Sequence, residues 1–228
     1  MSAPFYVSPE QQTQDKAEFA RKGISRGKPI VALDYDQGIL MIAENRSNNL
    51  RKFGEIYDQI AFGAVGKLDE YENLRKQGVR YADMRGYSFS RDDVCAANLA
   101  TEYSAVLGHQ FSQPYAKPLE VELLICEVGE EKNSYFQVMF DGFVRDCQEF
   151  VTIGGEPEKI DGALREGFAQ NMSLPDAFQL GVRALAQASN GSGTLDHKSL
   201  EVVLLDRGRI GRKFRRLSAD EIRGLEGS

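Results

Sequence analysis

Two long apolar runs lie in the first fifth of the chain, with a short polar turn between them. Residues 30–33 and 39–42 are uniformly apolar, and Asp36-Gln37-Gly38 lies between the two runs. Runs of strand length joined by a turn that contains glycine predict a β-hairpin. Because neither run alternates between apolar and polar residues, we expect both faces of the hairpin to be covered.

Further along the chain, strand patterns alternate with pairs of helical patterns. Strands are predicted at residues 59–66, 120–127, 135–140, 150–154, 199–205 and 212–217. The strands between residues 120 and 154 fit an antiparallel meander. Helices are predicted at residues 68–81, 94–107, 159–170 and 177–188, with capping sequences at Ser90 and Ser173, and a short terminal helix should follow Ser218. Strands in blocks and helices in pairs predict two packed sheets between two helical layers.

A predicted helix near the amino end is unusually polar. Ser8-Pro9-Glu10 is a favourable helix start, and the helix should cover residues 9–22. Only Ala17, Phe19 and Ala20 offer apolar surface for burial. A helix without an apolar face is weakly held by its own domain, so we expect it to fray or to lie against another molecule.

The bulk composition mainly excludes classes of function. The chain carries 28 basic and 34 acidic residues, and this formal net charge of −6 argues against general binding to nucleic acid. Cys95, Cys126 and Cys147 are far apart, and only His109 and His197 could help to build a metal site. We therefore expect reduced thiols, no metal and a cytoplasmic location. The sequence shows no signal peptide and no apolar run of membrane-spanning length, so no membrane contact is expected.

Several separated blocks of the sequence match a known family in the same order. They lie at residues 5–11, 18–24, 31–33, 66–75 and 85–87. On these residues the chain resembles a proteasome α subunit of the actinobacterial type over essentially its whole length. The resemblance implies an α+β fold, the four-layer αββα sandwich of the N-terminal nucleophile hydrolases. It divides the chain into a gating tail, residues 1–7, and a single αββα domain, residues 8–228.

The resemblance gives special weight to the residue that follows Gly27. In the homologous β subunits a threonine opens the first hairpin, and its hydroxyl attacks the peptide while its free amine acts as the base. Here Lys28 has no hydroxyl, and Pro29 removes the next backbone N–H donor. The single Gly-Thr pair, Gly193-Thr194, lies in a predicted late loop. We therefore expect no catalytic residue and no cofactor in this chain; the alternatives are an active amidohydrolase of the same fold and a free-standing binding module.

By resemblance, seven copies of the chain would form a ring stacked on the ring of proteasome β subunits, which cut the protein substrates in transit. The polar helix, residues 9–22, would lie on the surface of this ring against the neighbouring copy. The tail would gate the entry, because it carries two aromatic rings and no charged side chain; a frayed terminus is the alternative. The proposed gate residues are Met1, Ser2, Ala3, Pro4, Phe5, Tyr6 and Val7.

Lys52 is the residue for which the resemblance implies the most specific role. It matches the lysine that, between neighbouring α subunits, binds the C-terminal carboxylate of a ring-shaped ATPase activator. An ammonium group suits a carboxylate at a partly enclosed site. Arg51 is the alternative, since a slip of one residue in a strand would exchange the two side chains, and a solvated surface lysine is the simplest alternative. Glu18 and Gly66 match residues that line the same pocket.

A strongly basic segment lies near the carboxyl end. Residues 207–216 carry six basic residues in ten positions. Such a segment could contact phosphates. We instead expect a solvated edge strand, whose charges deter unwanted strand pairing.

Overall fold

The computed structural model describes residues 8–47, 49–187 and 195–226, whose strands form two five-stranded antiparallel sheets. Sheet A has the strand order β10 (Phe214–Arg216), β9 (Leu200–Asp206), β2 (Gly38–Glu44), β1 (Ile30–Tyr35) and β8 (Phe150–Ile153). Sheet B has the order β3 (Phe53–Tyr57), β4 (Ile60–Gly66), β5 (Val121–Glu127), β6 (Ser134–Val138) and β7 (Val144–Cys147). The predicted hairpin is confirmed, because β1 pairs with β2 in a register that sets Leu33 opposite Leu40.

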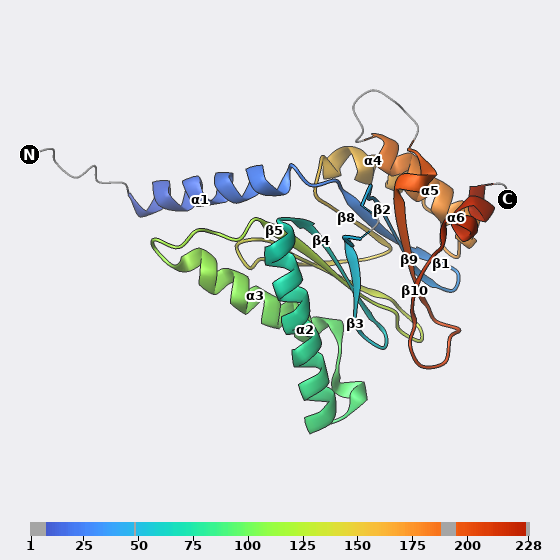
Figure 1. Cartoon of the computed structure of the whole chain (residues 1–228), viewed down its shortest axis with the longest axis horizontal. Coiled ribbons are helices and arrows are strands. Elements are labelled where there is room, and N and C mark those ends of the chain that lie inside the picture. Colours follow the sequence, from blue (N-terminus) through green and yellow to red (C-terminus); the bar gives the residue numbers. More distant parts are fainter. Residues whose placement is uncertain (1–7, 48, 188–194, 227–228) are drawn as a thin grey trace, which may run out of the picture.

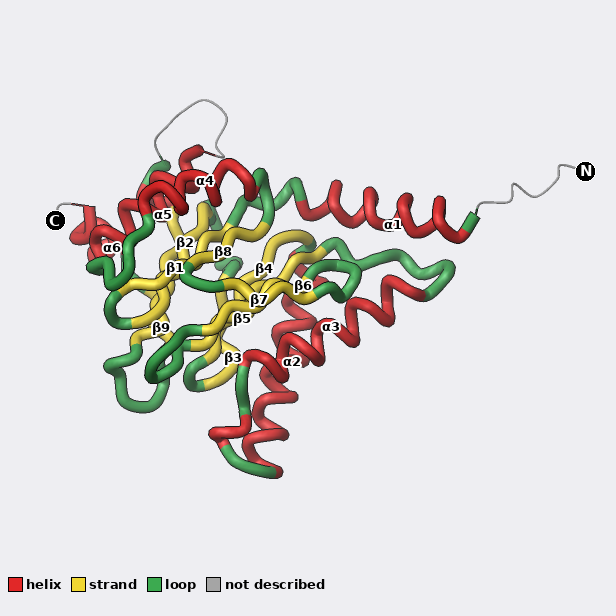
Figure 2. Tube along the Cα trace, turned by 180° about the vertical axis from the view of Figure 1, so that it is seen from behind, coloured by secondary structure: helices red, strands yellow, loops and turns green. Residues whose placement is uncertain are grey.

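Helices cover the outer face of each sheet, as Figures 1 and 2 show. Sheet A is covered by α4 (Pro157–Gly167) and α5 (Leu174–Gln187), with α6 (Ala219–Glu226) packed on α5. Sheet B is covered by α2 (Leu68–Ser88) and α3 (Ala96–Ser112). Two short 3-10 helices, η1 (Arg91–Asp93) and η2 (His197–Ser199), lie in the connections. The layers therefore follow the order helix, sheet, sheet, helix, and the predicted α+β sandwich is confirmed.

Three buried apolar clusters fill the spaces between these layers. Ile39 and Met41 of β2 meet Leu124 of β5 in the cluster between the two sheets. Leu40 and Ile42, the alternate residues of β2, face the helices that cover sheet A. A third cluster joins sheet B to α2 and α3. Because successive residues of a strand point to opposite faces, the uniformly apolar run 39–42 is buried on both sides, as predicted.

Helix α1 (Pro9–Ile24) extends away from the body of the sandwich (Figure 1). Its start agrees with the prediction, since Ser8 Oγ accepts a hydrogen bond from the N–H of Gln11 at 3.2 Å. The helix ends at Ile24, two residues beyond the predicted end at residue 22. Ala20 and Ile24 are its buried residues. The amino-terminal part of α1 therefore has little apolar cover within the chain, as its polar sequence predicts.

Ser90 was predicted to cap the start of a long helix, and this prediction was wrong. Ser90 Oγ accepts from the N–H of Asp92 and caps only η1. Helix α3 begins at Ala96, whose N–H donates to Glu127 Oε2 at 2.8 Å. A carboxylate from a distant strand thus satisfies the first turn of α3. The helix predicted at residues 68–81 also continues further, to Ser88.

The predicted meander was wrong in its last strand. Strand β6 pairs with β7, which the sequence pattern did not predict, whereas β8 crosses to sheet A and pairs with β1. The turn between β7 and β8 contains Glu149 with φ 68°. Strand β3 was not predicted either. Both missed strands lie at edges of sheet B, where a mixed polar pattern carries little strand signal.

Some predicted features lie outside the described residues. These are the gating tail, residues 1–7, and the loop at residues 189–194, which contains Gly193-Thr194. Within the described parts of the chain, no helix is both long enough and apolar enough to cross a membrane.

Candidate functional site

Lys52 lies directly before β3, at the end of the sandwich where β1 begins. Its Nζ donates a hydrogen bond to the carbonyl oxygen of Lys28 at 2.7 Å, and its backbone N–H donates to Glu201 Oε2 at 3.0 Å. The side chain of Lys52 is half-buried, whereas that of Arg51 is exposed. Of the two neighbouring cations, Lys52 therefore has the enclosed amine.

The environment of Lys52 changes its acidity. Burial lowers the pKa of its ammonium group to about 8, although the nearby carboxylates of Glu201 and Glu44 act in the opposite direction. Lys28, a second cation, lowers this pKa a little further. Loss of hydration disfavours the charged form of an amine, and a new anion beside it would favour that form again. A carboxylate that binds beside Lys52 would therefore stabilise its ammonium form.

Two buried carboxylates organise the cations around Lys52. Glu44 ends β2 and Glu201 lies on the neighbouring strand β9, and their exposed fractions are 6% and 4%. Glu44 binds Lys28 Nζ at 3.0 Å and Arg46 Nε at 3.0 Å. A carboxylate at this depth is stable only when cations or hydrogen-bond donors surround it. The buried acids therefore fix the positions of the cations.

Glu201 makes the larger number of these contacts. Its carboxylate accepts hydrogen bonds from the backbone N–H groups of Lys52 at 3.0 Å and Phe53 at 3.3 Å. It also accepts from Asn45 Nδ2 at 2.5 Å and forms an ion pair with Arg216. One side chain thus joins β9, β10 and the segment that enters β3. By holding that segment, Glu201 determines where the Lys52 side chain begins.

We define the Lys52 cluster as the four cations Lys28, Arg46, Lys52 and Arg216 with the carboxylates of Glu44 and Glu201. Four cations against two carboxylates leave a formal charge of +2 when Lys52 is protonated. An excess of positive charge fixed by buried acids favours binding of an anion. Neither acid was predicted as a site residue from the sequence. Their signal was a glutamate next to a long apolar run, Glu44 after the run 39–43 and Glu201 before the run 202–205, since a charge there requires a partner.

Gly66 lies close to the same end of the sandwich. It ends β4 with φ +120°, and a Cβ at this position would lie 1.9 Å from the carbonyl oxygen of Glu120. A Cβ on Gly27 would lie 3.2 Å from the nitrogen of Gly66, so Gly66 is beside the segment that leads into Lys28. Glycine is therefore required at position 66 by the backbone conformation and the close approach of the next strand.

Glu18 belongs to helix α1. It is on the exposed side of α1, where its Oε1 accepts from Gln14 Nε2 at 3.2 Å. The structure thus brings Lys52 and Gly66 to one end of the sandwich, and among the described residues no hydrogen bond or ion pair joins Glu18 to either of them.

The position of the expected nucleophile is occupied by Lys28. Its amine is paired with Glu44 at 3.0 Å, and its carbonyl oxygen accepts from Lys52. Pro29 follows and provides no N–H. Strand β1 begins one residue later, at Ile30. The entry to this strand therefore contributes an ion pair and an acceptor to the Lys52 cluster.

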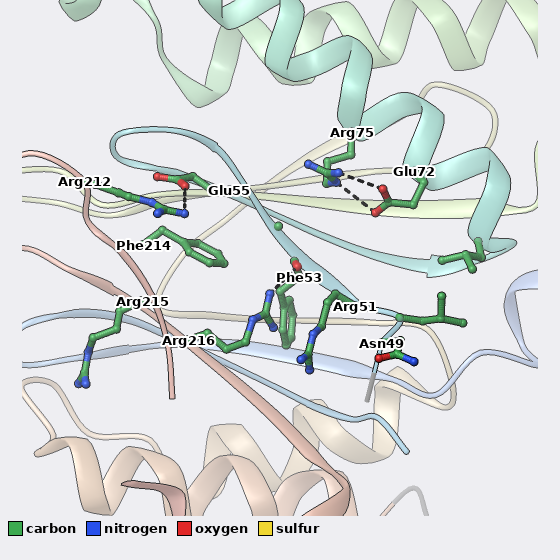
Figure 3. Close-up of a pocket in the computed structure, with 13 residues that line it drawn as sticks. Asn49, Arg51, Phe53, Glu55, Glu72, Arg75, Arg212, Phe214, Arg215 and Arg216 are labelled. Atoms are coloured by element: carbon green, nitrogen blue, oxygen red, sulfur yellow. Dashed lines mark hydrogen bonds and ion pairs between the residues drawn. The ribbon is translucent and has the colours of Figure 1, made fainter. Parts of the chain in front are cut away.

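A cavity of about 800 Å³ opens between the edge strands β3 and β10 (Figure 3). Its charged lining residues are Arg51, Arg75, Arg212, Arg215, Arg216, Glu55 and Glu72. Arg75 donates to Glu72 from Nε at 3.1 Å and from Nη2 at 3.0 Å, and Arg212 pairs with Glu55. Arg216 Nη2 donates to the carbonyl oxygen of Phe53 at 2.9 Å. The cavity thus has a strongly basic lining and adjoins the Lys52 cluster through Arg216.

Comparisons with known proteins agree with this architecture. Residues 24–204 match the proteasome subunit family. The protein named "Proteasome subunit alpha" of Thermobifida fusca is 47% identical over 224 residues, which cover 97% of this chain and 90% of that protein. The protein of the same name in Thermomonospora curvata is 49% identical over 227 residues, which cover 99% of this chain and 98% of that protein. The one in Streptomyces coelicolor is 47% identical over 229 residues, which cover 99% of this chain and 90% of that protein. The chain therefore belongs to the proteasome family, on the branch of the actinobacterial α subunits.

Proposed function

We propose that this α subunit is a non-catalytic part of the proteasome core particle in the cytoplasm. It forms the outer ring of seven copies, gates the entry to the proteolytic ring of β subunits and docks a ring-shaped ATPase activator. The observation that carries this proposal is the start of β1, where Lys28 is paired with Glu44 at 3.0 Å and is followed by Pro29. Neither residue supplies a hydroxyl nucleophile.

The Lys52 cluster supports the docking role. Its half-buried amine, with an excess of positive charge fixed around it, suits the terminal carboxylate of an activator's C-terminal tail. In the free subunit the amine donates to the carbonyl oxygen of Lys28, a neutral acceptor that a carboxylate would replace with gain in electrostatic energy. Gly66 lies at the same end of the sandwich, and Glu18 would be contributed by α1 of the adjacent copy.

The composition of residues 1–7 supports the gating role. The seven residues include Phe5 and Tyr6 and no charged side chain. Seven such tails could gather around a symmetry axis with little repulsion between side chains, and their aromatic rings would obstruct an entering polypeptide. Protein substrates would then pass this ring only when the tails move aside.

Co-expression with the cognate β subunit tests the assembly. We expect particles of stacked seven-fold rings in negative-stain images, and peptide hydrolysis that depends on the β subunit. The chain alone should hydrolyse no peptide. Hydrolysis by the chain alone, through a newly exposed amino terminus, would instead support the amidohydrolase alternative. A mass of one subunit in gel filtration, even with β present, would support the free-standing binding module.

Deleting residues 2–7 tests the gate in the same particle. We expect hydrolysis of small peptides to rise several-fold in the variant, because their entry no longer depends on displacement of the tails. The particle should keep its rings, which images of the variant would check. Unchanged hydrolysis by an intact particle would contradict the gate while leaving the assembly proposal in place.

A further inference from the structure

The two sheets end on opposite sides of the sandwich in pairs of edge strands. On one side lie β3 and β10, which are linked where Lys213 N donates to the carbonyl oxygen of Asp58 at 2.8 Å. On the other side lie β7 and β8, which are consecutive in the chain and are edges of sheets B and A. An exposed strand edge presents backbone N–H and C=O groups that can form hydrogen bonds with another chain. Each pair of edges is therefore a surface to which another chain could bind.

The two sides carry opposite charge. We define the basic edge as residues 49–58 and 206–216, and the acidic edge as residues 141–161. The basic edge has eight Lys and Arg residues against three Asp and Glu residues, a formal charge of +5. The acidic edge has six Asp and Glu residues against two Lys and Arg residues, a formal charge of −4. The two surfaces are complementary in charge.

Part of this charge is neutralised within the chain, but each edge keeps exposed charges. On the basic edge Arg212, Arg215 and Arg216 are paired with Glu55, Glu221 and Glu201. Arg51 and Arg209 are exposed and form no ion pair with a described acidic residue. On the acidic edge, Asp146 and Glu149 are exposed and form no ion pair with a described basic residue. These four side chains are available to a partner.

Both edges also expose large apolar side chains. Leu50 and Ile210 on the basic edge have exposed fractions of 53% and 101%, and Phe143 on the acidic edge has an exposed fraction of 62%. The cavity between β3 and β10 gives the basic edge a concave surface. Apolar residues beside charged ones, together with a concave surface, are typical of protein interfaces rather than of sites for small anions.

We propose that the basic edge of one copy of this chain binds the acidic edge of the next copy, so that the copies associate head to tail. This inference rests on the ring proposed above and assigns the surfaces that form it. A two-fold dimer through either edge would place like charges against each other, which is unfavourable. Because the edges lie on opposite sides of the sandwich, each copy can contact two neighbours. A repeated head-to-tail contact closes into a ring when its rotation divides a full turn, as the proposed ring of seven requires.

Charge reversal in the particle co-expressed with β subunits tests this assignment. The first variant carries Arg51→Glu and Arg209→Glu, and the second carries Asp146→Arg and Glu149→Arg. We expect each variant to raise, about tenfold or more, the protein concentration at which half of the chains are assembled. The reason is that each variant places like charges at every contact between copies. A chain with all four substitutions has both edges reversed and should recover assembly. Sedimentation velocity measures the assembled fraction.

Folding defects and general charge effects are controlled separately. The four substituted side chains are exposed and lack described ion pairs, and recovery in the fourfold variant would exclude misfolding as the cause. The matched control carries Lys76→Glu and Arg80→Glu, which are exposed on α2, and should assemble normally. Normal rings in both two-residue variants would overturn the edge assignment and leave the proposed function intact. Absence of rings in the unchanged chain would overturn the proposed function itself.

Discussion

Replacing Lys52 with alanine is expected to abolish stimulation of protein degradation by the ring ATPase. The variant loses the enclosed amine of the Lys52 cluster, and a hydrogen bond to a charged group contributes about 1.5–3 kcal/mol. The same loss occurs in every copy of the ring, so the tails of the activator lose all equivalent contacts together. The measurement is the ratio of ATP-dependent degradation of a folded substrate to hydrolysis of a small peptide by the same particle.

Two further variants make this result specific. Lys76→Ala removes an exposed lysine from α2 and should leave the ratio unchanged. Arg51→Ala tests the alternative assignment at the neighbouring residue. If stimulation survives in Lys52→Ala but is lost in Arg51→Ala, in particles of normal size, the docking residue is Arg51 and the assignment to Lys52 is wrong.

The same amine predicts a dependence on pH. Since only the ammonium form attracts a carboxylate, activator binding should weaken as the pH rises through about 8, the pKa of Lys52 in the free subunit. A bound carboxylate raises this pKa, so saturating activator should move the decline to higher pH. The contribution of Lys52 to folding stability depends on pH with the opposite sign. Between pH 8 and the ordinary value of 10.5 the unfolded chain holds more protons at this residue, so the contribution of Lys52 to stability rises with pH.

Replacing Glu201 with alanine is expected to destabilise the fold by about 3–5 kcal/mol. The variant leaves Arg216 without its buried counter-charge and leaves the N–H groups of Lys52 and Phe53 without their acceptor. Glu201→Gln retains one oxygen of similar position and should lose less. Urea denaturation measures the free energy of unfolding. Because Glu201 supports the charge of Lys52, both variants should also shift the pH profile of activator binding to lower pH.

An exposed acid of the same region provides the comparison. Glu221 pairs with Arg215 where both side chains are partly exposed to solvent, and it accepts from the backbone N–H of Ser218 at 2.8 Å, at the start of α6. Glu221→Ala should change the free energy of unfolding by about 0.5–2 kcal/mol, because it removes a surface ion pair and a helix cap. If Glu201→Ala costs no more than Glu221→Ala, the buried carboxylate is not what holds the Lys52 segment in place.

The sequence by itself determined the layers of this protein. The runs 30–33 and 39–42 have no polar face, so they had to be covered on both sides, and paired amphipathic helices were available to cover them. The polar sequence of α1 likewise predicted that little of this helix would be buried in its own domain. The identity of residue 28 was enough to argue against a hydroxyl nucleophile at that position. Each of these conclusions depends on local periodicity or on a single residue type.

Only the tertiary structure decided how distant segments meet. Glu127 caps α3, β8 leaves the meander for sheet A, and Glu201 holds the segment that carries Lys52. The opposite charges of the two sandwich edges also became visible only when β3 was placed beside β10 and β7 beside β8. These features depend on the register between strands far apart in the chain, and one residue of slip would exchange the faces of every side chain involved. Hydrophobic periodicity carries no information about that register, because it reports which face is buried and not which partner buries it.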